Sequence, residues 1–185
     1  ENVPDILNHG GINVAELVSK SLDEEGYDVA YTLLNSAWYG VPQIRERMIL
    51  VGVHRAAGVK PRFPVPTHHL VLPSGYISSK NAARRVLKAE GSAHHRWVPD
   101  PAPDSPAATS ASDALADLPP RFAMDLLRTG AIRRGAKDPS EAVEYTTAEP
   151  TTAYSRLMRE WKGFATKSTT GHVFRYLPRD YKIFA

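Results

Sequence analysis

Apolar side chains near the start of the chain recur at the spacing of one helix face. The residues that make this pattern are Val14, Leu17, Val18 and Leu22. They follow one another at intervals typical of a helix with one apolar side. Asn13 is suited to cap the start of such a helix, and Gly26 to follow its last turn. The pattern predicts an amphipathic helix over residues 14–25.

Two mostly apolar runs follow, at residues 28–35 and 48–53, and both are rich in residues that favour strands. Residues 36–47 between them have the composition of a loop. Apolar runs of this length beside a helix are typical of a sheet that is covered on both faces. The sequence therefore predicts an α/β fold of the doubly wound kind for this part of the chain.

From residue 58 onward the pattern is irregular, because prolines at positions 61, 64, 66, 73, 99, 101, 103 and 106 interrupt any long element. A second lobe is expected to begin there. Short helices are predicted at residues 81–90 and 113–118, and an exposed linker at 98–110. A clearer helix is predicted at 152–161, with a stripe expected to be buried that consists of Tyr154, Leu157, Met158 and Trp161.

Composition excludes several classes of protein. No window approaches the roughly 18 consecutive apolar residues of a membrane-spanning helix, so a cytoplasmic or nucleoid location is expected. The chain of 185 residues contains no cysteine, which excludes disulfides and thiolate metal sites. Its histidines lack regular ligand spacing, and adjacent ones such as His68 and His69, or His94 and His95, should point apart. No metal site is predicted.

Charge is distributed unevenly along the chain. Residues 1–53 hold eight acidic and three basic side chains, a net charge of −5, and residues 54–185 hold 12 acidic and 20 basic ones, a net charge of +8. A basic region of this kind suits a polyanion such as nucleic acid. It equally fits ordinary solvated surface.

Two short polar stretches stand out. One is Glu1-Asn2 at the start of the chain, and the other is residues 39–47, which lead into the second apolar run. Alternation along an extended chain would place Gln43, Arg45 and Arg47 on one face, as a ledge of donors suited to bind oxygen atoms. Taken alone, each stretch also fits a polar surface.

Together and in this order, these stretches resemble the middle of the DNA (cytosine-5) methyltransferases. The resemblance rests on ENV at residues 1–3, YGVPQIRER at 39–47 and VGVHR at 51–55, and it continues in patches as FPVPTH at 63–68, ALADLP at 114–119 and GHV at 171–173. It implies an α/β fold with part of the Rossmann-like sheet of S-adenosylmethionine-dependent methyltransferases at residues 1–57. A smaller, irregular target-recognition region would follow at 58–170, and a return segment toward the catalytic domain at 171–185.

The implied reaction is methyl transfer from S-adenosylmethionine to carbon 5 of a cytosine flipped out of duplex DNA. By this resemblance Glu1 binds and protonates N3 of the cytosine, and Arg47 stabilises the charge that develops on O2. Arg45 would hold the nucleophile loop or a nearby phosphate, with Asn2 and Gln43 supporting the arrangement.

DNA reading would fall to basic residues beyond residue 58. The candidates are Arg84, Arg85, Lys88, Arg96, Arg128, Arg133 and Arg134. They suit contacts with phosphates or guanine edges of double-stranded DNA. Each cluster fits a solvated helix face just as well.

The sequence also lacks two parts of the family pattern, the glycine-rich cofactor loop and the Pro-Cys dipeptide that supplies the nucleophile. We therefore expect the chain alone to be inactive and not to bind S-adenosylmethionine. A fragment of a longer enzyme with a missing N-terminal portion is favoured, and its exposed apolar surface should drive self-association. One half of a split methyltransferase, completed by another chain, and an inert sequence-specific DNA-binding module are the alternatives.

Overall fold

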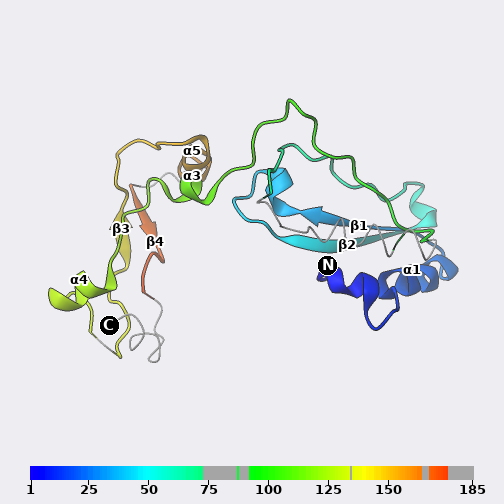
Figure 1. Ribbon diagram of the computed structural model, residues 1–185, viewed down its shortest axis with the longest axis horizontal. Helices are drawn as coiled ribbons and strands as arrows, with labels where there is room; N and C mark the ends of the chain where they lie inside the picture. Colours follow the sequence, from blue (N-terminus) through cyan, green and yellow to red (C-terminus); the bar gives the residue numbers. More distant parts are fainter. Residues whose placement is uncertain (73–86, 88–91, 134, 164–166, 175–185) are drawn as a thin grey trace. The chain divides into compact units, whose positions relative to one another are not determined.

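The computed structural model describes residues 1–72, 87, 92–133, 135–163 and 167–174 (Figure 1). The chain divides into two compact units, Glu1–Ser110 and Ala111–Ala185. Residues 58–72 and 92–110, which were assigned from the sequence to the recognition region, thus belong to the first compact unit. The functional division after residue 57 concerns which residues read DNA, and it stays a prediction.

The elements of the first unit that the structure describes in full are a long α-helix, two strands and short 3-10 helices. In chain order these are η1 (Pro4–Asn8), α1 (Val14–Glu24), β1 (Tyr27–Asn35), η2 (Ser36–Tyr39), β2 (Glu46–His54) and η3 (Arg55–Ala57). The two strands run side by side (Figure 1) and are antiparallel. Leu33 lies opposite Met48. The predicted helix and both predicted strands are confirmed to within two residues at each end. The mixture of helix and strand agrees with the predicted α/β class.

The core of the first unit lies between α1 and the two strands. Its buried apolar cluster comprises Leu7, Ala15, Tyr31, Leu33, Met48 and Leu87. Residues 29–33 of β1 are all buried, as expected for a strand covered on both faces. The apolar stripe of α1 does not coincide with its buried side, because Leu17 and Val18 are exposed whereas Glu16 and Ser19 are buried.

A buried polar cluster explains why α1 packs with its polar side inward. The Glu16 carboxylate accepts a hydrogen bond from the Tyr31 hydroxyl (3.1 Å) and from the amides of Ala93 and His94, and it lies 2.9 Å from Nδ1 of His94. The backbone of Tyr31 pairs with the same segment, accepting from Arg96 N at 2.9 Å and donating to His94 O at 3.1 Å. Residues 92–97 are thereby fixed to the outer edge of β1.

Burial changes the ionisation of this cluster. Burial raises the pKa of Glu16, but hydrogen bonds from His94 and Tyr31 outweigh it, so that the pKa of Glu16 lies below its ordinary value. Burial raises the pKa of Tyr31 to about 12. Burial, together with the charge of Arg96, lowers the pKa of His95 to about 4. At neutral pH the cluster therefore holds one carboxylate, a neutral phenol and a neutral imidazole at His95.

The second unit is built from short elements, namely α3 (Ala111–Leu115), α4 (Ala123–Arg128), β3 (Ala142–Glu144), α5 (Ala153–Arg159) and β4 (Ser168–Thr170). β3 and β4 pair antiparallel, and α3 contacts α5 (Figure 1). The predicted helices at 113–118 and 152–161 correspond to α3, which begins and ends earlier, and to a shorter α5. The helix predicted at 81–90 lies outside the described residues, apart from the buried Leu87.

The expectation that the apolar stripe of α5 is buried is wrong. The stripe has three exposed residues, Leu157, Met158 and Trp161, and one half-buried residue, Tyr154. The helix packs through its polar side instead, because Nη1 of buried Arg159 lies 3.0 Å from Oδ2 of Asp117. The Arg159 guanidinium also lies 4.0 Å above the ring of Tyr145. An ion pair, rather than an apolar stripe, thus sets the orientation of α5.

A second ion pair ties together the two ends of this unit. Arg121 donates to Oδ2 of Asp138 at 2.8 Å and to the carbonyl oxygen of His172 at 2.9 Å. Burial raises the pKa of Asp138, but hydrogen bonds from Ser140 and Phe174 and the charge of Arg121 bring it down to about 2. Two charge pairs that are largely shielded from solvent thus hold parts of the second unit together.

Candidate functional site

The first residues of the chain pair with β2. Asn2 N donates to Met48 O at 2.9 Å, and Met48 N donates to Asn2 O at 2.8 Å. This pairing places Glu1 beside Arg47, with Oε2 of Glu1 3.5 Å from Nε of Arg47. The structure therefore brings together the two polar stretches that the sequence singled out, although they are 46 positions apart.

The Glu1–Arg47 pair presents acceptors and donors side by side. The Arg47 side chain is 24% exposed and that of Glu1 is 56% exposed. Nη1 of Arg47 also donates to the carbonyl oxygen of Glu46 at 2.7 Å, which restricts the guanidinium. An ion pair this open to solvent is weak, so both groups can exchange it for hydrogen bonds to a ligand. A carboxyl group beside a guanidinium suits a ring that carries an amine and a carbonyl on neighbouring edges.

The structure does not form the regular donor ledge expected from alternation. β2 begins only at Glu46, and the backbone bends at Pro42 and Gln43, where Gln43 N donates to Val41 O at 2.7 Å. Gln43 and Arg45 are consequently exposed on a loop before the strand. Proline restricts the backbone and removes one donor, so the strand ladder cannot extend back through this position.

Ser36, which is not among the residues predicted from the sequence, holds this loop closed. Its hydroxyl donates to the carbonyl oxygen of Gln43 at 2.6 Å, and its amide donates to that of Arg45 at 3.0 Å. The Ser36 carbonyl in turn accepts from Val41 N at 3.3 Å. The pair Asn35-Ser36 at the end of an apolar run could have indicated this role. Side chains of both types form hydrogen bonds with nearby backbone groups where regular structure stops.

Three of the seven predicted DNA-contacting residues lie among the described residues, Arg96 in the first unit and Arg128 and Arg133 in the second. Arg84, Arg85, Lys88 and Arg134 lie outside the described residues. In the first unit, Nη1 of Arg96 donates to the backbone carbonyl oxygens of Ala93 and His95. Its guanidinium thus helps to hold its own segment.

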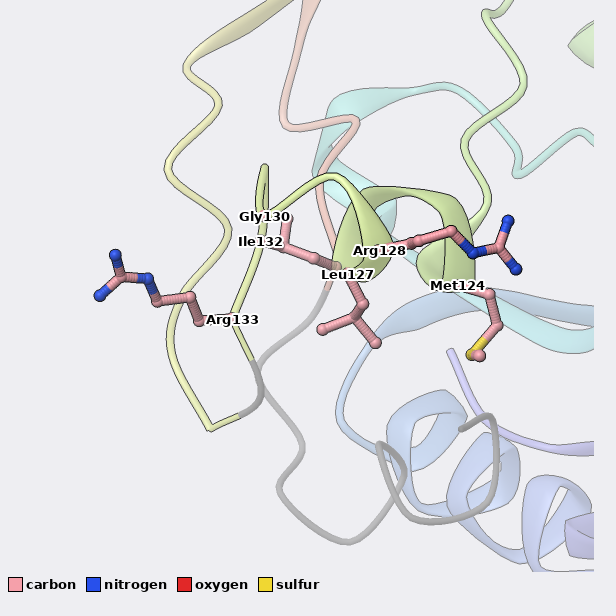
Figure 2. Close-up of a pocket in the computed structure, with 6 residues that line it drawn as sticks. All are labelled: Met124, Leu127, Arg128, Gly130, Ile132 and Arg133. Carbon is pink, nitrogen blue, oxygen red and sulfur yellow. The ribbon is translucent and has the colours of Figure 1, made fainter.

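The other two placed residues, Arg128 and Arg133, line a pocket of about 530 Å³ in the second unit. Figure 2 shows their side chains extending to opposite sides of this pocket. Arg128 is exposed and lies 3.3 Å from Oδ1 of Asp125, and Arg133 is exposed on the loop that follows α4. The floor includes Leu127 and the buried Ile132. Two exposed guanidinium groups around an apolar floor form a cationic surface.

The turn at Gly10-Gly11 precedes α1, but it closes the short pairing of His9 with Ile12, and a Cβ added at either glycine would meet no atom within 4 Å. There is therefore no cradle around these glycines. Within the described residues, no helix is long and apolar enough to cross a membrane. No group of three or more His, Asp or Glu side chains there is placed to hold a metal ion.

Comparison with known proteins gives one consistent result. Residues 1–170 match the family model described as C-5 cytosine-specific DNA methylase. The putative type II methyltransferase M.OihORF3336P of Oceanobacillus iheyensis is 29% identical over 186 residues, which cover 100% of this chain and 38% of that protein. Type II methyltransferase M.BsuRI of Bacillus subtilis is 38% identical over 68 residues, or 37% of this chain and 16% of the relative.

A third relative, type II methyltransferase M.MspI of a Moraxella species, is 39% identical over 51 residues, or 28% of this chain and 12% of its own length. The chain thus spans well under half the length of the curated relatives it matches.

Proposed function

Because the chain belongs to the C-5 cytosine-specific DNA methylase family, we propose that it forms the base-binding part of a DNA cytosine-5 methyltransferase. The complete enzyme transfers a methyl group to carbon 5 of a cytosine in duplex DNA. The observation that carries the proposal is the contact between Glu1 and Arg47 at the pairing of Asn2 with Met48. It gathers, at one place, the two groups that the chemistry of the base requires.

Those requirements follow from the reaction. Addition of a nucleophile to carbon 6 of cytosine makes carbon 5 reactive and places negative charge on N3 and O2. The Glu1 carboxyl group binds N3 and the exocyclic amine and shares a proton with N3. The Arg47 guanidinium donates to O2 and stabilises the charge there. The base must leave the helical stack to reach these two residues, so base flipping is part of the proposal.

The other predicted residues have supporting roles. Asn2 fixes the position of Glu1 through its pairing with β2. Arg45, exposed on the loop that Ser36 closes, contacts the nucleophile loop or a DNA phosphate, and Gln43 on the same loop supports this arrangement. The cationic surface around Arg128 and Arg133 contributes to DNA binding.

The remaining chemistry comes from sequence outside this chain. The chain has no cysteine, so it lacks the thiolate that attacks carbon 6 in this family. S-adenosylmethionine, when bound by the complete enzyme, supplies the methyl group. The open Gly10-Gly11 turn shows no close-packed cradle for it. The Rossmann-like sheet is likewise completed only in the longer protein, and this chain alone is inactive.

The absence of cysteine also supports a second candidate, in which the chain works as one half of a split enzyme or as an inert DNA-binding module. A direct experiment separates these functions. The full-length protein that contains this chain is produced in a bacterial host whose DNA carries no 5-methylcytosine, and the DNA is sequenced after bisulfite treatment.

The proposal predicts methylated cytosines in one sequence context, their loss in Arg47→Ala, and none when this chain is produced alone. Methylation that needs a second gene would identify the split form. Duplex DNA binding without methylation in any combination would leave the inert module and overturn the enzyme.

A further inference from the structure

A proline-containing segment, residues 64–69, lies across the start of the loop that carries Arg45. We call this segment the strap. The carbonyl oxygen of Trp38 accepts hydrogen bonds from the amides of Thr67 and His68, each at 2.9 Å. The hydroxyl of Thr67 also lies 3.3 Å from the same oxygen. A single backbone oxygen with this number of donors is held firmly in position.

The strap has two further contacts with the same loop. The Tyr39 hydroxyl donates to the carbonyl oxygen of Pro64 at 3.0 Å. The His68 ring covers Gly40, so closely that a Cβ added at Gly40 would lie 3.0 Å from its Cε1. Gly40 has a φ of +82°, a conformation that L side chains rarely adopt. Nδ1 of His68 lies 2.9 Å from Oγ1 of Thr67, which fixes the orientation of the ring.

The opposite side of the strap is anchored elsewhere in the first unit. His69 N donates to the carbonyl oxygen of Pro106 at 2.9 Å, and Ala108 N donates to that of His69 at 2.7 Å. Nδ1 of His69 lies 2.6 Å from the carbonyl oxygen of Ser105. Adjacent histidines therefore point apart, as the sequence predicted, with His68 facing the loop and His69 facing residues 105–108.

We propose that the strap is a positioning device for catalysis, in which Thr67 and His68 fix the loop of residues 36–45 and thereby Arg45. Ser36 bonds within the loop, and the pairing of Asn35 with Glu46 holds the two ends of the loop together. The strap holds the part between those ends, at residues 38–40, and the prolines at 64 and 66 limit its own freedom. The catalytic part of the inference rests on the proposed methyltransferase function. Misplacement of a catalytic group by about 1 Å can lower a rate on the order of a hundredfold.

The first test measures hydrogen exchange in the full-length protein by mass spectrometry. It compares the wild type with the double variant Tyr39→Phe/His68→Ala, and His9→Ala serves as a control because it alters an exposed histidine. We expect exchange of the Gly40 and Val41 amides to become on the order of tenfold faster in the double variant, with β1 and β2 unchanged. Unchanged loop exchange, or an equal increase throughout β1 and β2, would overturn the positioning role.

The second test measures steady-state methyl transfer and DNA binding with the same proteins. The double variant should lose roughly ten- to a hundredfold in kcat, while the Kd for duplex DNA changes by less than about twofold. Normal kcat with a faster-exchanging loop would mean that the strap holds the loop without serving catalysis, and it would refute the inference. If the wild-type protein transfers no methyl group, the proposed function fails, and the exchange experiment still decides whether the strap fixes the loop.

Discussion

His95 should make the first unit sensitive to acid in a defined pH range. The residue is 8% exposed, and its ring packs edge-on against Tyr31 and Trp97, at centroid distances of 5.3 and 4.3 Å. Nε2 of His95 has no hydrogen-bond partner among the described residues. Burial, with the charge of Arg96 as the next cause, lowers the pKa of this imidazole from 6.5 to about 4. The folded unit therefore excludes a proton that the unfolded chain binds readily.

The sign and size of the effect follow from proton linkage. Above pH 6.5 the histidine is neutral in both states, so it does not change the free energy of unfolding. Between pH 6.5 and 4 only the unfolded chain takes up the proton, and stability falls by about 1.4 kcal/mol for each pH unit. The loss amounts to roughly 2 kcal/mol at pH 5 and about 3 kcal/mol over the whole range. Below pH 4 this contribution no longer changes.

Urea unfolding followed by circular dichroism at pH 7.5 and pH 5.0 measures this loss. The variant His95→Phe keeps an aromatic ring and removes the titrating group, and His9→Ala again serves as an exposed control. Between the two pH values, the wild type and the control should lose roughly 2 kcal/mol more stability than His95→Phe. An equal loss in all three proteins would show that protonation of His95 does not lower the free energy of unfolding. It would refute the view that burial lowers the pKa of His95.

Two further predictions concern structural contacts. Asp117→Asn leaves the buried Arg159 charge without its counterion and should lower the unfolding free energy of the second unit by about 3 kcal/mol. Glu160→Gln removes a charge from an exposed pair and should lower it by less than about 1 kcal/mol. Thermal unfolding compares the two variants, and equal shifts of the midpoint would contradict this expectation. Gly40→Ala should lower the thermal stability more than Gly58→Ala does. Both glycines have a positive φ, but of the two only Gly40 faces a close ring, that of His68. Equal losses of stability would show that the contact with the His68 ring has no effect.

Local patterns were sufficient to predict the elements of the first unit. Helical spacing predicts α1, and two apolar runs predict β1 and β2. These predictions succeed because the formation of a helix or strand depends largely on neighbouring residues. The meeting of Glu1 with Arg47 followed from the family resemblance rather than from any periodicity. No pattern within either stretch indicates that the start of the chain pairs with β2.

Features that depend on distant partners could not be predicted in this way. Periodicity identifies the apolar side of α5, but the side that packs is decided by Asp117, which is 42 positions from Arg159. The sequence of the strap indicates a family resemblance but not its contacts. Those contacts join Thr67 and His68 to Trp38, which is far away in the sequence. In both cases a polar interaction between separated segments overrides the local preference.

We propose that Glu1 and Arg47 hold the target cytosine. A decisive measurement is the single-turnover rate of methyl transfer by the full-length enzyme carrying Glu1→Gln, with Glu24→Gln as the control at an exposed glutamate of α1. We predict that Glu1→Gln lowers this rate on the order of a hundredfold or more, while the control keeps the wild-type rate. A wild-type rate for Glu1→Gln would contradict the assignment of the base-binding site to this end of the chain.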